Sequence, residues 1–297
     1  MCLNATRAES GPISVDFCML RRCSRFARVV GFLLIWATAA EAFAGESSPS
    51  PVAQISAAPL ARKNEIKLFV MVGDVDQALK VLKLDEADAV QQEVCFFETA
   101  DGELEAHQVI LRARQKDAKA GDSTVKIRVA EGTNGELSVE ELAITPEQDW
   151  TQEDRPSLSR SLDDRKLPTG LVPRVAAGEG SIVELFNKNQ QKLLAARMKD
   201  FQWDSLKRYG PVETRVWREY RTFDGFQEKV TIERWHLEKD GRSLEILEVS
   251  AKTKAETEEQ ALAMAKQFFG AAKAAGLGEP SGQTKTRMVL DFFKPGR

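Results

Sequence analysis

Two neighbouring segments of the chain alternate between hydrophobic and polar residues. In residues 109–114 and 124–129 the basic side chains share one parity, and every position of the opposite parity is hydrophobic. Because successive side chains of a strand point to opposite faces, the pattern predicts an antiparallel hairpin with an apolar face and a basic face. Four cations at this spacing repel one another unless water or an anion lies among them, so the face is either solvated or part of an anion site. The basic face carries Arg112, Arg114, Lys126 and Arg128.

The rest of the chain shows further strand and helix patterns. Helical spacing predicts helices after Asp74, from Ser181 to the Gly210-Pro211 break, and from Thr253 to near Gly276. Residues 145–180 hold four prolines and show no clear period, so we expect a long polar loop or lid-like insertion there. Strands interleaved with helices predict an α+β fold. Alternation predicts the strands at residues 65–72, 93–98, 136–144, 214–221, 229–238, 244–252 and 286–293.

The N-terminal part has the character of a targeting segment. A basic stretch, a short apolar run and an Ala42-Phe43-Ala44 site predict a signal peptide over residues 1–44. Residues 1–18 lack this character, which indicates a gene-model extension before a true start at Met19. Residues 45–62 are predicted to be a flexible linker and residues 63–297 a single domain. We therefore expect an exported protein, periplasmic or secreted, with no membrane anchor after cleavage.

Composition narrows the chemistry of the expected mature chain. Removal of residues 1–44 leaves 37 basic and 42 acidic residues, a balance of about −5 that disfavours nucleic acid as a partner. Cys95 is then the one cysteine left and lies in an apolar stretch, so we expect a buried thiol without a disulfide. Two distant histidines give little material for a histidine-based metal site or a catalytic triad.

Five short motifs follow one another over residues 63–278. They are Glu65-x-Lys67, a Phe-Phe-Glu-Thr run at 96–99 before Asp101-Gly102, the two basic segments described above, and residues 244–250 before a helix. In this order and spacing they resemble the CYTH or triphosphate tunnel metalloenzyme superfamily. The resemblance implies an antiparallel, tunnel-like β-barrel with flanking helices, whose basic wall binds a polyphosphate and whose acidic wall holds a divalent cation such as Mg²⁺ or Mn²⁺.

The resemblance also implies roles for individual residues. Glu65 and Glu248 would be metal ligands, the latter sharing a strand face with Ser250 and Lys252. The first glutamate of the family's Glu-x-Glu-x-Lys signature is Lys63 here, which removes a ligand and adds a positive charge that weakens metal binding. Alternatively, Glu65 and Glu248 belong to ordinary solvated strand faces. The phosphate ligands would be Lys67, Arg112, Arg114, Lys126 and Arg128.

Two functions fit these motifs, and the partner in both is a small polyphosphate anion. The first is metal-dependent hydrolysis of inorganic triphosphate or short polyphosphate, which makes use of both walls of the tunnel. The alternative is a non-catalytic anion-binding or scaffold protein on the same fold. Lys63 favours the alternative, whereas the basic hairpin fits both.

Overall fold

An antiparallel sheet organises the part of the chain that the structure describes. The computed structural model describes residues 75–116, 119–129, 142–154, 156–220, 224–277 and 284–294, which all belong to one compact unit, residues 56–297. Within these residues eight strands follow the order β4-β5-β3-β2-β1-β6-β7-β8. Their bounds are β1 Val90–Thr99, β2 Val109–Lys116, β3 Gly121–Arg128, β4 Thr145–Asp149, β5 Ser157–Leu167, β6 Leu206–Tyr220, β7 Val230–Lys239 and β8 Arg242–Ala251.

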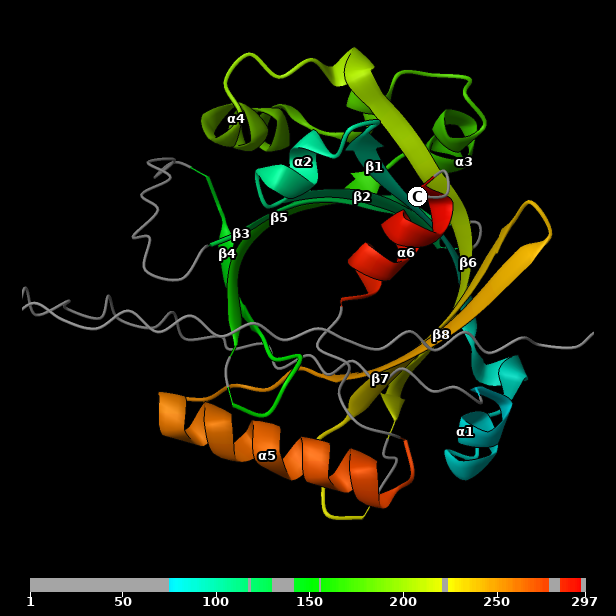
Figure 1. Cartoon of the computed structure of the whole chain (residues 1–297), viewed down its shortest axis with the longest axis vertical. Helices are drawn as coiled ribbons and strands as arrows, with labels where there is room; N and C mark the ends of the chain where they lie inside the picture. The colour runs from blue at the N-terminus through cyan, green and yellow to red at the C-terminus, as the bar shows by residue number, and fades with distance from the viewer. Residues whose placement is uncertain are drawn as a thin grey trace, which may run out of the picture. The chain divides into compact units, whose positions relative to one another are not determined.

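The sheet curls round on itself, as Figure 1 shows. Its two end strands, β4 and β8, are not paired with each other in the described residues, so the sheet is tunnel-like but not closed. The α+β, tunnel-like fold predicted from the sequence is confirmed in this open form. The helices are α1 Val75–Val81, α2 Glu103–Ala106, α3 Leu171–Ala176, α4 Lys188–Arg197, α5 Glu258–Ala274 and α6 Lys285–Phe293, with short 3-10 turns η1 Glu86–Asp88, η2 Ile182–Leu185 and η3 Trp203–Ser205.

Helices cover the outer face of the sheet in two places. Leu111 and Val125 of the hairpin pack in one buried cluster with Val172 of α3 and Leu193 of α4. A second cluster joins Val249 and other outward residues of β7 and β8 to the apolar side of α5 and to α1. In Figure 1, α5 and α1 accordingly lie at β7 and β8, whereas α2, α3 and α4 lie over β1 and β2.

One helix, α6, lies against the inner face. Val289 and Leu290 pack in a third buried cluster with Val94 and Phe96 of β1 and Trp235 of β7. Figure 1 shows α6 within the curve of the sheet. Burial of each such side chain stabilises the fold by about 1.5–3 kcal/mol, so α6 is firmly held inside the tunnel. None of the helices in the described residues is long and apolar enough to span a membrane.

Three predictions about secondary structure are wrong. Residues 145–180 do not form a long loop, because β4, β5 and α3 occupy most of that segment. Residues 286–293 are not a closing strand but belong to α6. The expected long helix from Ser181 is instead the turn η2 and the separate helix α4, and β6 already begins at Leu206.

Other predictions are confirmed. The hairpin of β2 and β3 pairs Arg112 with Thr124 and Ile110 with Lys126. β1, β7 and β8 lie within two or three residues of their predicted bounds. Asp240 and Gly241 both have positive φ angles, 51° and 72°, which suit a tight hairpin turn between β7 and β8. The predicted strand at 65–72 and most of the one at 136–144 lie outside the described residues.

Candidate anion site

The inner face of the curled sheet lines a cavity of about 730 Å³, called here the tunnel cavity. Inward-facing residues of β2, β3, β5, β7 and β8 contribute to it, together with the start of α6. Ten basic and seven acidic side chains of the described residues line it. The predicted basic face of the hairpin therefore faces this cavity, and not open solvent as in the alternative interpretation. The basic lining residues are Arg112, Arg114, Lys116, Lys126, Arg128, Arg165, Arg218, Lys229, Lys252 and Lys285.

Arg112 is a buried cation of the cavity wall without an ion pair to a carboxylate in the described residues. It donates one hydrogen bond, 3.1 Å long, from its guanidinium to the hydroxyl of Thr124, which in turn donates to Asp163 at 2.7 Å. Its Nε is buried and has no hydrogen-bond partner among the described residues. Burial, and next the neighbouring Arg114, lower the pKa of the Arg112 guanidinium, and the charges of Asp122, Glu233 and Asp163 offset this only in part. A buried guanidinium in this state is a site for an anionic ligand.

Arg128 resembles Arg112 in its surroundings. Its guanidinium donates to the hydroxyl of Thr284 at 3.1 Å, just before α6. Burial lowers the pKa of the Arg128 guanidinium, and the charge of Asp149 offsets this only in part. No ion pair joins Arg112 or Arg128 to a carboxylate in the part of the chain described. These two guanidiniums are therefore the strongest candidates for phosphate ligands among the predicted residues.

The other two predicted cations of the hairpin already have carboxylate partners. Arg114 donates to Asp122 at 2.7 Å, and Lys116 lies 2.7 Å from the same carboxylate. Burial alone would lower the pKa of Arg114, but Asp122 outweighs it and raises that pKa. Lys126 bonds Glu147 at 2.7 Å and also bonds Asp149, both from β4. An anion would have to compete with these carboxylates for Arg114 and Lys126.

An acidic pair faces the tunnel cavity from β7 and β8. Glu233 and Glu248 are direct partners in the register of the two strands, and their side chains are 13% and 8% exposed. The Lys285 ammonium lies between them, 2.5 Å from Glu233 and 3.0 Å from Glu248. Burial alone would raise the pKa of Glu233, but Lys285, followed by Arg114 and Arg112, lowers it. Glu233 is therefore charged, and Lys285 bonds both members of the pair.

The described residues do not fit a divalent cation. Glu248, predicted as a metal ligand, does face the cavity with Ser250 and Lys252, but it bonds an ammonium group. No group of three or more histidine, cysteine or acidic side chains in the described residues could hold a metal ion. Mg²⁺ requires near-octahedral oxygen ligands, whereas the Lys285 ammonium already bonds both carboxylates of the acidic pair. Lys63, Glu65 and Lys67 lie outside the described residues.

Sequence patterns missed several residues of this site. Glu233 could have been identified from the sequence, because it lies opposite Glu248 once β7 and β8 are paired in register. Asp122 and Asp163 were harder to identify. Asp122 lies near the hairpin loop, at the start of β3, and Asp163 lies in the segment predicted as a loop. No sequence pattern pointed to Lys285, because the segment that follows it was predicted as a strand and its position depends on how α6 packs inside the sheet.

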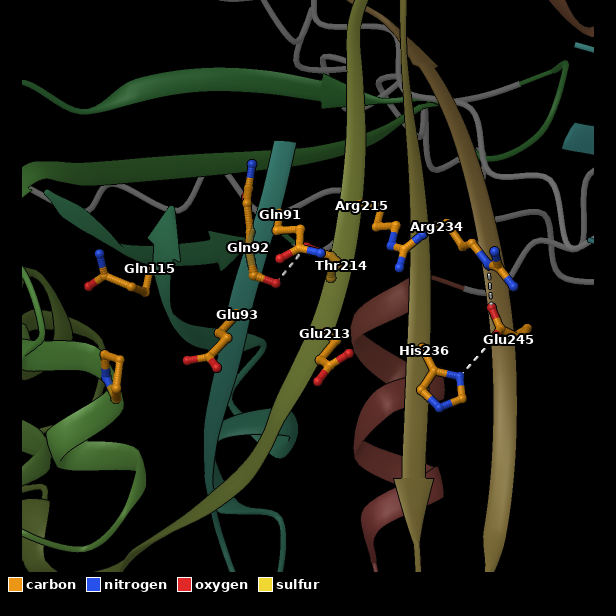
Figure 2. A pocket seen from close by; sticks show the side chains of 11 residues that line it. Gln91, Gln92, Glu93, Gln115, Glu213, Thr214, Arg215, Arg234, His236 and Glu245 are labelled. Atoms are coloured by element: carbon orange, nitrogen blue, oxygen red, sulfur yellow. Dashed lines mark hydrogen bonds and ion pairs between the residues drawn. The ribbon is translucent and has the colours of Figure 1, made fainter. Parts of the chain in front are cut away.

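A second cavity, of about 620 Å³, lies on the outer face of the sheet, and Figure 2 shows its side chains. Its cations are largely neutralised by neighbours. Arg234 contacts Glu86 at 2.8 Å and Glu245 at 2.9 Å, and Arg215 also pairs with Glu86. His236 Nδ1 lies 2.6 Å from the Glu245 carboxylate. This outer-face groove therefore offers an anion much less uncompensated positive charge than the tunnel cavity.

Comparisons with known proteins give similarities in fold. No protein-family model and no curated protein sequence matches the chain. A Bacillus halodurans protein described as a candidate adenylate cyclase aligns with a TM-score of 0.49 and 16% identity, over 76% of this chain and 97% of that one. A Hippeastrum protein described as a candidate adenylyl cyclase with a dominant triphosphatase activity aligns with a TM-score of 0.46 and 18% identity, over 76% and 94%.

A third solved structure, the PH1819 protein from Pyrococcus horikoshii, aligns with a TM-score of 0.41 and 9% identity, over 77% of this chain and 99% of that one. Two of these solved structures are thus described by cyclase names, and one of the two also by a triphosphatase activity. These similarities concern the fold. The function proposed below rests on the tunnel cavity of this chain.

Proposed function

We propose that the tunnel cavity binds a small, highly charged anion of the inorganic polyphosphate class, and that the chain is an anion-binding protein of the CYTH type. The observation that carries the proposal is the buried Arg112 guanidinium, whose Nε has no hydrogen-bond partner among the described residues and which has no carboxylate partner there. A buried charge without a partner is costly, so a ligand that supplies the missing negative charge binds favourably.

The shape and charge of the cavity support this ligand class. Its volume lies within the range of about 300–1,000 Å³ that is usual for small-molecule sites. Arg112 and Arg128 are both inward-facing residues of one hairpin, and each guanidinium can donate two parallel hydrogen bonds to a phosphate. The whole chain has a net charge of −3, so the excess of basic over acidic side chains in the cavity is local. A general polyanion such as nucleic acid is therefore a poor candidate.

Hydrolysis of the bound anion is the second candidate function. The observation that favours it is the acidic pair Glu233 and Glu248, which faces the same cavity as the guanidiniums. Phosphoryl transfer to water usually needs a divalent cation to neutralise developing charge. Because Lys285 lies between these carboxylates, we place binding ahead of hydrolysis. Export to the periplasm or the exterior, predicted from residues 1–44, is part of the same proposal.

Calorimetric titration with inorganic tripolyphosphate tests the proposal. Arg112→Met keeps much of the side-chain volume and removes the charge, so we expect the dissociation constant to rise by at least about tenfold, or 1.4 kcal/mol. Phosphate release should be measured in parallel, with and without Mg²⁺. Without ligand, we expect the melting temperature of Arg112→Met to be equal to or above that of the unchanged protein, because a buried cation without an ion-pair partner has been removed.

Arg160→Met is the matched control, because Arg160 lies on β5 with the outward parity and does not line the tunnel cavity. Its affinity for tripolyphosphate should equal that of the unchanged protein. Equal affinity of Arg112→Met and the unchanged protein would contradict the proposed site. Absence of any binding heat or thermal stabilisation in the unchanged protein would contradict the proposed function as a whole.

A further inference from the structure

We propose that Lys285 is the fixed cation of the tunnel cavity, and that the chain binds its anion free of divalent metal. The inference rests on the proposed anion-binding function and deepens it. Its starting point is the pair of carboxylates on β7 and β8. Glu233 and Glu248 lie opposite each other on the same face of neighbouring strands, both largely buried. Two such carboxylates repel unless a proton or a cation lies between them.

The protein supplies that cation itself. The Lys285 ammonium bonds both carboxylates, at 2.5 Å and 3.0 Å. It also lies 4.7 Å from the centre of the Trp235 ring, whose indole nitrogen donates to Glu233 at 3.1 Å. A carboxylate pair and an aromatic face together define one position for the ammonium group. The Lys285 charge is therefore placed by several contacts and is only 16% exposed.

The backbone around Lys285 is equally fixed. Lys285 is the first residue of α6, and the side chain of Thr284 caps that helix by accepting from the Arg287 amide. The buried Val289 and Leu290 hold the helix against the inner face. The Thr284 hydroxyl also accepts from Arg128, one of the two candidate phosphate ligands. The start of α6 thus connects the acidic pair to the basic wall.

This arrangement has a consequence for the ligand. An anion near Arg112 would be repelled by the charged Glu233, which lies close enough for each to influence the pKa of the other. Elsewhere a divalent cation bound between carboxylates and phosphate removes such repulsion. Here Lys285 neutralises the acidic pair, and it repels any second cation from the same position. The cavity therefore selects the metal-free form of a short polyphosphate.

Titration with tripolyphosphate in excess EDTA tests this directly in the unchanged protein. We expect the same affinity in EDTA as in Mn²⁺-containing buffer once metal binding by the ligand is accounted for, and no binding of Mn²⁺ alone. Loss of tripolyphosphate binding in EDTA, with recovery on adding Mn²⁺, would overturn the inference and leave the proposed function standing. Failure of tripolyphosphate to bind under both conditions would overturn the proposed function.

A series of variants at Lys285 gives a second test of the inference. Lys285→Met should weaken tripolyphosphate binding in EDTA by at least about tenfold, and Mn²⁺ should restore it, because the two carboxylates become available to the metal. Lys285→Arg should keep the metal-free binding. Lys266→Met removes one exposed charge on the outer helix α5 and should change nothing. Binding of Mn²⁺ alone that is equal in the unchanged protein and in Lys285→Met would overturn the assignment of Lys285, whatever the anion does.

Discussion

Arg112 and Arg114 are two residues apart on one strand, yet their surroundings differ in kind. Asp122 neutralises Arg114 and raises its pKa, whereas burial lowers that of Arg112. Alternation along the strand predicts that both face the same side, and the cavity confirms that direction. Alternation cannot predict which of the two arginines has a carboxylate partner, because the register between β2 and β3 determines which residue lies opposite each of them. The sequence thus indicates which face of the strand carries the arginines, and the strand pairing determines which arginine is available to bind an anion.

The surroundings of Asp122 predict how the stability of the fold depends on pH in the acid range. Burial alone would raise its pKa, but Arg114 and Lys116 lower it below the ordinary value of 3.8. Its stabilising effect is therefore fully present above pH 3.8 and is lost as the pH falls through the lower pKa of the folded state. Removing one partner of a buried ion pair costs about 3–5 kcal/mol, and we expect the lower end because Arg114 is partly exposed.

Urea unfolding of Asp122→Asn across this pH range measures the effect. The difference in unfolding free energy between the variant and the unchanged protein should be largest near neutral pH and should shrink below pH 3.8. Asp154→Asn, at an exposed position, serves as the control and should show no such trend. A difference that stays constant down to low pH would show that the Asp122 charge does not stabilise the folded state.

At the scale of elements, Glu98 explains how a helix as short as α2 persists. Its carboxylate is buried and accepts hydrogen bonds from the backbone amides of Thr99 at 2.7 Å, Leu104 at 2.9 Å and Glu105 at 2.8 Å. The amides of Leu104 and Glu105 lie in the first turn of α2 and have no partner within that helix. Glu98 lies in the Phe-Phe-Glu-Thr run that contributes to the family resemblance, and its role in this structure is to hold α2 on β1.

Glu98→Ala should therefore destabilise the fold by about 2–3 kcal/mol, because it leaves buried amides without acceptors. Hydrogen exchange should accelerate at the amides of Leu104 and Glu105. The exposed Glu103→Ala, in α2 itself, should cost no more than about 0.5 kcal/mol. Tripolyphosphate affinity should be unchanged in Glu98→Ala, because Glu98 does not line the tunnel cavity. A variant as stable as the unchanged protein would contradict this role.

The two main elements that the sequence mispredicted, β5 and α6, have different physical causes. β5 carries few apolar residues, because inward-facing Ser161, Asp163 and Arg165 line a polar cavity. Its strand period is therefore not a hydrophobic period, and the segment resembles a loop. The segment of α6 is short and mixes apolar with charged residues, which alternation alone cannot distinguish from a strand. Its helical form depends on burial against several strands at once, which is a tertiary effect.

At the scale of the whole described unit, the outer and inner faces of the curled sheet have different roles. Outward residues pack under α1–α5 and supply most of the core, which frees the inner face to carry charge. α6 fills part of the inner space with apolar side chains and brings Lys285 to the remainder. The α+β class followed from alternation and element order, and the tunnel-like form followed from the family resemblance. The division of the inner face into an apolar part and a charged part did not, because it depends on where α6 packs.

A crystal structure with inorganic tripolyphosphate, grown in EDTA, tests the central claim most directly. The account predicts a phosphate group within hydrogen-bonding distance of the Arg112 and Arg128 guanidiniums, with the Lys285 ammonium still between Glu233 and Glu248. Tripolyphosphate bound in the outer-face groove, with the tunnel cavity holding none, would contradict it.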